Sequence, residues 1–239
     1  MSYDAHVFRP QDLTLADQAS RDERASFIAK TYLHLLGAVL AFVAIEAALL
    51  SSSIAERLTQ SMVTGYNWLM VLGAFMFVSY VANRWAVSAT SLGMQYAGLS
   101  LYVVAEAIIF VPILYMASNF GGEGVIPTAG VVTVCVFTGL TSVVFFTRKN
   151  FSFLGPLLGV LGFVALGFIV CSILFGFSLG MVFTVIMIGV TAGYILWSTS
   201  KVLHEYHIGQ HVAASLALFA SVALLFWYIL QFVMAMSRD

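Results

Sequence analysis

The sequence has little charge and few cysteines. Only 9% of its 239 residues are charged, whereas 61% are apolar. A soluble domain usually has about a quarter of its residues charged, so this composition excludes an ordinary water-exposed surface and indicates a membrane protein. Ten basic and eleven acidic residues nearly cancel, which excludes a polybasic nucleic-acid-binding protein.

Both cysteines, Cys135 and Cys171, lie inside long apolar runs. No paired cysteine framework or metal-ligand spacing surrounds them, so we expect neither a disulfide scaffold nor a zinc site. The sequence also lacks a Gly-x-Ser-x-Gly elbow, a phosphate-binding loop and a dinucleotide fingerprint. We therefore expect no enzyme activity, no resident metal and no cofactor.

Seven apolar segments are long enough to cross a membrane, which takes about 20 residues of helix. Alternating ten-residue segments, which are typical of membrane β-strands, do not occur. The sequence therefore predicts an all-α integral membrane protein with seven transmembrane helices. These are expected at Phe27–Leu50, Met62–Ala82, Leu92–Ala117, Val125–Thr147, Phe151–Phe175, Phe177–Trp197 and Val212–Met236.

Residues 1–26 are polar and mixed in charge, so we expect a short, mobile, water-exposed tail before a transmembrane domain at 27–239. Lys and Arg favour the cytoplasmic side of a membrane. If the N-terminus is cytoplasmic, only Arg57 and Arg238 lie on the outer side. We therefore expect a cytoplasmic N-terminus and an external C-terminus. The inner residues are Arg9, Arg21, Arg24, Lys30, Arg84, Arg148, Lys149 and Lys201.

Glu106 lies near the middle of the third predicted span. A charged side chain at this depth costs about 2.5–3.5 kcal/mol, so the carboxyl group must face the bundle interior, find a partner or keep its proton. It is a candidate for an ion or proton pathway, although a neutral Glu hydrogen-bonded to a neighbouring helix would explain it equally well. Pro112 in the same span frees the carbonyl of Ile108, which could help to coordinate a cation.

Other titratable residues are weaker candidates. Glu46 lies near the outer end of the first span, where it could mark an outer vestibule, but a residue that reaches toward interfacial water is the better interpretation. His204, His207 and His211 have a spacing that could bind a metal or sense pH. Because Gly209 argues against one unbroken helix, we favour a solvated inner loop with pH sensitivity over a metal site.

Several short segments resemble bacterial members of the Bax inhibitor 1-like family, also called the transmembrane Bax inhibitor motif-containing family. Their order and spacing carry the resemblance, which covers nearly the whole chain after the tail. The segments are FIAKTYL at Phe27–Leu33, QYAGL at Gln95–Leu99, YVVAE at Tyr102–Glu106, Pro112, FSFL at Phe151–Leu154 and AASLALF at Ala213–Phe219.

The resemblance implies a seven-helix bundle whose last span is central and wrapped by the other six. It also implies a pH-sensitive calcium-leak channel that acts in cell death or stress responses, here in a bacterial inner membrane. Ca²⁺ would then be the transported ion. A bacterial branch of the family associates with a membrane protease, so the implied partners are the lipid bilayer and such a protease.

The chain departs from the family at its pH sensor. Ser198 and Ser221 stand where the family has a pair of aspartates, and Arg84 matches the arginine that assists them. Two close carboxylates share a proton and bind a cation once both are ionised, whereas two hydroxyls cannot. One possibility is therefore a calcium leak that is weak, constitutive or routed past Glu106. The other is that this member of the fold has lost its conductance.

Three functions remain open. A leak-type channel with altered gating is favoured by the polar set Arg84, Glu106, Ser198 and Ser221. A non-conducting membrane adaptor, or a modulator of a membrane protease or stress response, is favoured by the missing acids. A small-solute permease would show interrupted spans in both halves, and only the span with Pro112 is clearly interrupted.

Overall fold

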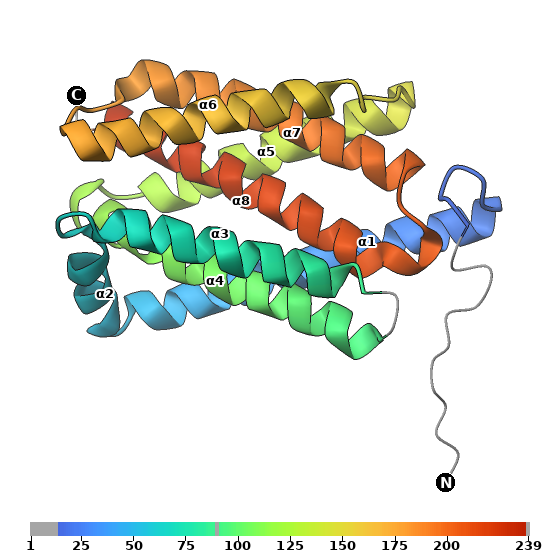
Figure 1. The fold of residues 1–239 in the computed structure, drawn as a ribbon, viewed down its shortest axis with the longest axis horizontal. Helices are drawn as coiled ribbons and strands as arrows, with labels where there is room; N and C mark the ends of the chain where they lie inside the picture. Colours follow the sequence, from blue (N-terminus) through green and yellow to red (C-terminus); the bar gives the residue numbers. More distant parts are fainter. Residues whose placement is uncertain (1–13, 89–90, 238–239) are drawn as a thin grey trace, which may run out of the picture.

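The computed structural model describes residues 14–88 and 91–237, which form a bundle of helices (Figure 1). Seven helices in this part of the chain are long and apolar enough to cross a membrane. The predicted all-α, seven-span membrane fold is therefore confirmed. In chain order the helices are α1 (Arg21–Leu50), α2 (Ile54–Val63), α3 (Asn67–Ala86), α4 (Leu92–Phe120), α5 (Val125–Thr147), α6 (Leu154–Phe175), α7 (Gly180–His204), the short 3-10 helix η2 (Ile208–Gln210) and α8 (His211–Met236).

The second span differs from its predicted bounds. It was expected at Met62–Ala82, but α2 ends at Val63 and the spanning helix α3 runs over Asn67–Ala86. Gly65, between the two helices, has a φ of +58°, a left-handed conformation that glycine adopts without strain. Hydropathy alone does not detect such a break, because apolar residues lie on both sides of it.

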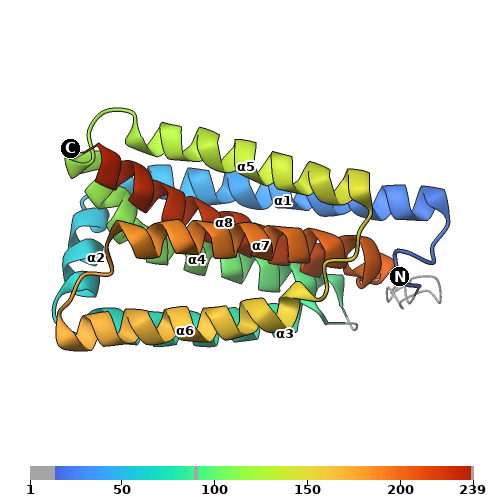
Figure 2. The same cartoon turned by 90° about the horizontal axis from the view of Figure 1, so that it is seen from above.

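Helices α4 and α8 form the centre of the bundle. In the most apolar 18-residue stretch of each span, 67% of residues are buried in α4 and 50% in α8, against 11–22% in the other five. Helix α8 packs against α1, α3, α4, α5 and α7, and Figure 2 shows it between a layer that contains α1 and α5 and one that contains α3 and α6. The predicted central position of the last span is confirmed, and α4 shares it.

Helix α6 is the outermost span, and it packs mainly on α7. Ala165 of α6 reaches the centre through a small buried cluster with Met187 of α7 and Tyr228 of α8. Gly155 near the start of α6 lets the indole of Trp197 approach, since an added Cβ there would lie 2.8 Å from Nε1 of that ring. Gly159, one turn later, has open space around it, so of these two glycines only Gly155 allows a close approach.

The two ends of the bundle differ in charge. One end, where α1 and α8 begin, gathers most of the basic residues, and we call it the basic end (Figure 1). The opposite end carries helix α2 and the exposed charged residues Glu56, Arg57 and Glu123, and we call it the α2 end. The described residues of the basic end include Arg21, Arg24, Lys30, Arg84, Arg148, Lys149 and Lys201.

The last part of the expected tail is ordered and packed. Helix α1 starts at Arg21 with a capping box formed by Ser20 and Glu23, six residues before the predicted span. Ala16 is fully buried, and its amide donates to the carbonyl of Tyr206 at 2.9 Å. Burial and the neighbouring Glu205 charge raise the pKa of Tyr206 to about 12. The segment from residue 14 therefore belongs to the bundle, while residues 1–13 lie outside the described part.

Candidate functional site

Glu106 lies on the central helix α4 and lines a cavity whose wall also includes exposed side chains, such as Leu224 of α8 and Phe177. The side chain of Glu106 is 5% exposed, and its Oε2 atom has no hydrogen-bond partner among the described residues. No hydrogen bond from a neighbouring helix reaches it within that part of the chain. The arrangement therefore differs from the alternative of a structural Glu that is satisfied by an adjacent helix.

The cavity has a volume of about 480 Å³ and lies between α3, α4, α6, α7 and α8. The link between α6 and α7 lines it, so the cavity extends toward the α2 end. Thr184 and Gln231 supply neutral polar groups to its wall. Most of the wall is apolar, and its aromatic members include Trp68, Phe75, Phe110, Phe183, Trp227 and Tyr228.

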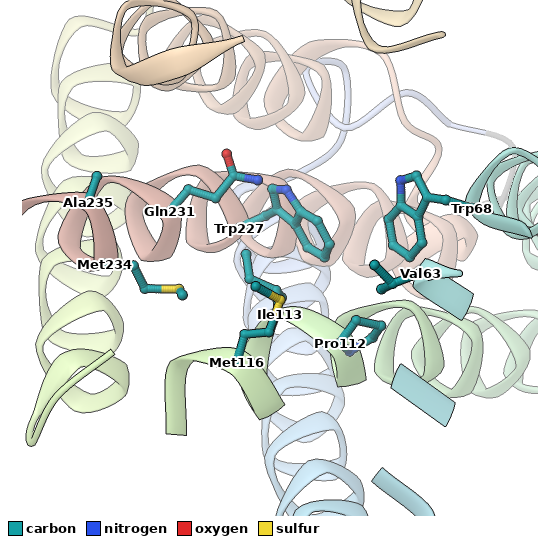
Figure 3. A pocket seen from close by; sticks show the side chains of 9 residues that line it. All are labelled: Val63, Trp68, Pro112, Ile113, Met116, Trp227, Gln231, Met234 and Ala235. Atoms are coloured by element: carbon teal, nitrogen blue, oxygen red, sulfur yellow. The ribbon is translucent and has the colours of Figure 1, made fainter. Parts of the chain in front are cut away.

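A second cavity of about 400 Å³ adjoins the first. The two share Trp68, Trp227 and Gln231, and Figure 3 shows how these side chains lie with the others of the second cavity. Pro112 is part of the second wall and lies inside the continuous helix α4. The proline therefore shapes the neighbouring cavity without interrupting the helix that carries Glu106.

Packed aromatic rings lie between Glu106 and the basic end of the bundle. Tyr102, one turn earlier on α4, lies within hydrogen-bonding reach of the Glu106 carboxyl group, and it is also close to Tyr194 of α7. Its ring packs edge-on against Phe219 of α8 with centroids 6.1 Å apart, and lies 6.0 Å from the ring of Phe75. These side chains fill the interior between the cavity and the basic end.

The structure brings Ser198 and Ser221 together. Ser221 Oγ lies 3.1 Å from Ser198 Oγ, to which it donates, and 2.8 Å from the carbonyl oxygen of Ala217. Ser198 Oγ donates to the carbonyl of Ile195 at 3.2 Å. Both side chains are buried, so the pair is a closed, neutral set of hydrogen bonds between α7 and α8.

Arg84 lies apart from this pair. It is in the last turn of α3 and is exposed, whereas both serines are buried. Among the described residues, no hydrogen bond or ion pair joins Arg84 to either serine. The structure therefore does not bring Arg84 together with the two serines.

Glu46 is buried, which corrects the interpretation that it reaches interfacial water. Its side chain is 4% exposed, and both carboxyl oxygens lack a partner among the described residues. Phe42, one turn before Glu46, packs edge-on against Phe110, one turn after Glu106, with centroids 5.2 Å apart. The two acids therefore lie on opposite sides of an aromatic contact between α1 and α4.

The three histidines near residue 204 do not share one helical face. His204 ends α7 and its Nδ1 lies 2.9 Å from the carbonyl of Ser200, while His207 pairs with Gln210. His211 starts α8 and its ring lies 5.0 Å from that of His34 on α1. The described residues contain no group of three His, Cys, Asp or Glu side chains that could hold a metal.

Several side chains around Glu106 were not predicted from the sequence. Tyr102 could have been found, because it lies one helical turn from Glu106 on the same helix. Trp68, Trp227 and Gln231 come from two other spans, so no local spacing links them to the acid. Only the packing of α3 and α8 against α4 brings them together.

Comparisons with known proteins identify the family. Residues 24–239 match the family described as Inhibitor of apoptosis-promoting Bax1. A Pseudomonas aeruginosa protein, itself described as uncharacterized, is 28% identical over 163 residues, which cover 66% of this chain and 67% of the relative. No solved structure matches the chain. The match extends over nearly all of the described bundle, and this chain therefore belongs to the Inhibitor of apoptosis-promoting Bax1 family, the Bax inhibitor 1-like family.

Proposed function

We propose that this protein is a leak-type cation pathway in which the carboxylate of Glu106 binds the passing ion. The observation that supports this is the cavity that extends from the α2 end to Glu106. Glu106 is the one acid among the residues that line it, and its Oε2 has no partner among the described residues. A buried polar oxygen without a partner costs free energy unless a ligand satisfies it. A passing cation would satisfy it.

The proposed ion is Ca²⁺, held weakly. Calcium takes about six to eight oxygen ligands, whereas the cavity wall offers one carboxylate and neutral groups such as those of Thr184 and Gln231. So few oxygen ligands favour transient binding of Ca²⁺ over tight binding. Because Ser198 and Ser221 carry no titratable acid, the leak is expected to lack the pH gate that an aspartate pair would supply.

In the described arrangement the pathway is closed toward the basic end. The rings of Tyr102, Phe219 and Phe75 pack against one another there. Conduction therefore requires these rings to move apart, and a rearrangement of packed side chains of this kind limits the rate. A slow basal leak follows from this packing.

The proposal places the basic end in the cytoplasm and the cavity toward the outside of a cell membrane. Lys and Arg are enriched on the cytoplasmic side of membrane proteins, and the basic end gathers most of the described Lys and Arg residues. The N-terminus is then cytoplasmic and the C-terminus external. Cations would enter the cavity from the outer side.

Calcium influx into liposomes that contain the purified protein tests this function. The proposal expects influx above that of empty liposomes, and expects Glu106→Gln to remove most of it, because the amide keeps the shape of the side chain and removes its charge. A thermal unfolding curve for Glu106→Gln controls for misfolding. Wild-type protein without influx contradicts the proposal.

A non-conducting adaptor is the second candidate function. The observation that favours it is the serine pair, whose hydroxyls are buried and satisfied by each other and by backbone carbonyls. Such a pair stabilises the contact of α7 with α8 and gives no site for an ion. Silence of the wild type in the flux assay, together with co-purification of a membrane protease, would favour this function.

A further inference from the structure

We propose that the cavity at the α2 end is a binding site for a small organic ammonium ion, which packs on the indole rings of Trp68 and Trp227 and pairs with the carboxylate of Glu106. This goes beyond the proposed leak, because binding at the site requires no conduction. The inference rests on the aromatic wall, on the Oε2 atom of Glu106, which has no partner among the described residues, and on the lack of Lys, Arg and His among the residues that line the cavities.

The aromatic rings of the wall lie close to one another. The indoles of Trp68 and Trp227 are 6.2 Å apart between centroids and 21° from parallel. Phe110, one turn after Glu106, packs edge-on against Trp227 with centroids 4.9 Å apart, which brings the acid and the indoles into one site. An ammonium group within about 6 Å of an aromatic centroid is attracted by the negative face of the ring, and Trp is the best such ring.

The charge of the wall selects a cation. Glu106 is the one acidic residue, and the residues that line the two cavities include no Lys, Arg or His. Glu106 is buried, and its Oε2 atom lacks a partner among the described residues. A single buried carboxylate matches a single positive charge.

Two other occupants fit this wall less well. An acyl chain would leave Oε2 of Glu106 unsatisfied, and a buried polar atom without a hydrogen bond costs about 1–3 kcal/mol. A divalent metal ion would be held only weakly while it passes, because tight binding takes more oxygen ligands than one carboxylate and scattered neutral groups provide. A soft, weakly hydrated organic cation can use both the rings and the acid.

Size and access agree with this ligand class. The cavity volume of about 480 Å³ lies within the usual range for small-molecule sites, about 300–1,000 Å³. The α6–α7 link lines the cavity, and the exposed charged residues described at the α2 end are Glu56, Arg57 and Glu123. A cation that approaches from this end therefore meets no cluster of basic side chains among the described residues.

Equilibrium dialysis of isotope-labelled benzyltrimethylammonium against the full chain in nanodiscs of phosphatidylglycerol, a lipid without an ammonium group, tests the proposal, with empty nanodiscs as the blank. We expect saturable binding by the wild type. Glu106→Gln should weaken it about tenfold or more, and Trp227→Leu should weaken it as well. Glu46→Gln is the matched control, because Glu46 is an equally buried acid behind the Phe42–Phe110 contact, and it should leave binding unchanged.

Neopentylbenzene, which has the shape of the probe without its charge, should not displace it. Absence of saturable binding by the wild type would overturn the proposal. Unchanged binding in folded Glu106→Gln would also overturn it, and so would displacement of the probe by neopentylbenzene. Either result would indicate an apolar cavity that lipid chains fill. If Glu106→Gln does not fold, full binding by Trp227→Leu overturns the proposal by itself. Because the assay measures no flux, a failed leak with intact binding separates this proposal from the proposed function.

Discussion

Glu46 and Glu106 are both buried acids on inward faces of their helices, and their surroundings differ. Glu106 borders a cavity with space for a ligand, whereas Glu46 lies behind the contact of Phe42 with Phe110 and neither of its oxygens has a partner among the described residues. Burying a polar group without a hydrogen bond destabilises the folded state. We therefore regard Glu106 as a binding group and Glu46 as a local destabilising feature.

Replacing Glu46 with Met should raise the stability of the bundle. The change removes two unsatisfied oxygens and keeps a flexible chain of similar length, so a gain of about 1–3 kcal/mol is expected. Thermal unfolding in detergent measures it, with Glu123→Met at an exposed loop position as the control. A clear loss of stability would show that Glu46 makes a favourable interaction.

The serine pair allows a direct test of the missing acids. With Ser198→Asp and Ser221→Asp combined, two close carboxylates would share a proton at mildly acid pH and bind a cation when both ionise at mildly alkaline pH. Calcium influx into liposomes should then rise with pH more steeply than in the wild type. The pair Ser198→Ala and Ser221→Ala is the control, and equal pH dependence in the two double variants would argue against this interpretation.

At the scale of helices, the contact of α3 with α4 holds the cavity wall in place. Gly98 of α4 lies against the backbone of α3, since an added Cβ would be 2.5 Å from the carbonyl oxygen of Ala82 and 2.6 Å from the amide nitrogen of Ala86. Small residues allow this kind of close approach between membrane helices. The same α3 carries Trp68 and Phe75 into the cavity, so its spacing from α4 sets the width of the site.

Gly98→Ala should therefore separate α3 from α4. Backbone atoms cannot move aside as flexible side chains do, so the cost is expected at about 1–3 kcal/mol. Gly73→Ala on α3 is the matched control, because nothing lies within 4 Å of its added Cβ. Unfolding midpoints in detergent compare the two variants, and equal midpoints would contradict the close approach of these helices.

At the scale of the whole molecule, the difference between the two ends predicts an orientation. Single cysteines at Glu56→Cys on the α2 end and Lys149→Cys on the basic end, in a background without Cys135 and Cys171, would be probed with a membrane-impermeant maleimide on intact cells. The first should react from outside and the second only after permeabilisation. The reverse pattern would place the cavity in the cytoplasm.

The sequence predicted the seven spans and the central last helix because both follow from apolar length and from a resemblance that covers the chain. It did not predict the break at Gly65, the burial of Glu46 or the pairing of His211 with His34. Hydropathy reports that a segment is apolar, but it does not report which neighbour faces each side chain. For the same reason Glu106 could be singled out from its depth, whereas its cavity could not.

The central claim is that cations pass Glu106, and calcium influx by two matched variants tests it most directly. Glu106→Gln and Glu46→Gln make the same chemical change at two buried acids of the same bundle, and each would be reconstituted at an equal protein-to-lipid ratio beside the wild type. The account predicts wild-type influx in Glu46→Gln and influx near that of empty liposomes in Glu106→Gln. Equal influx in both variants would contradict it.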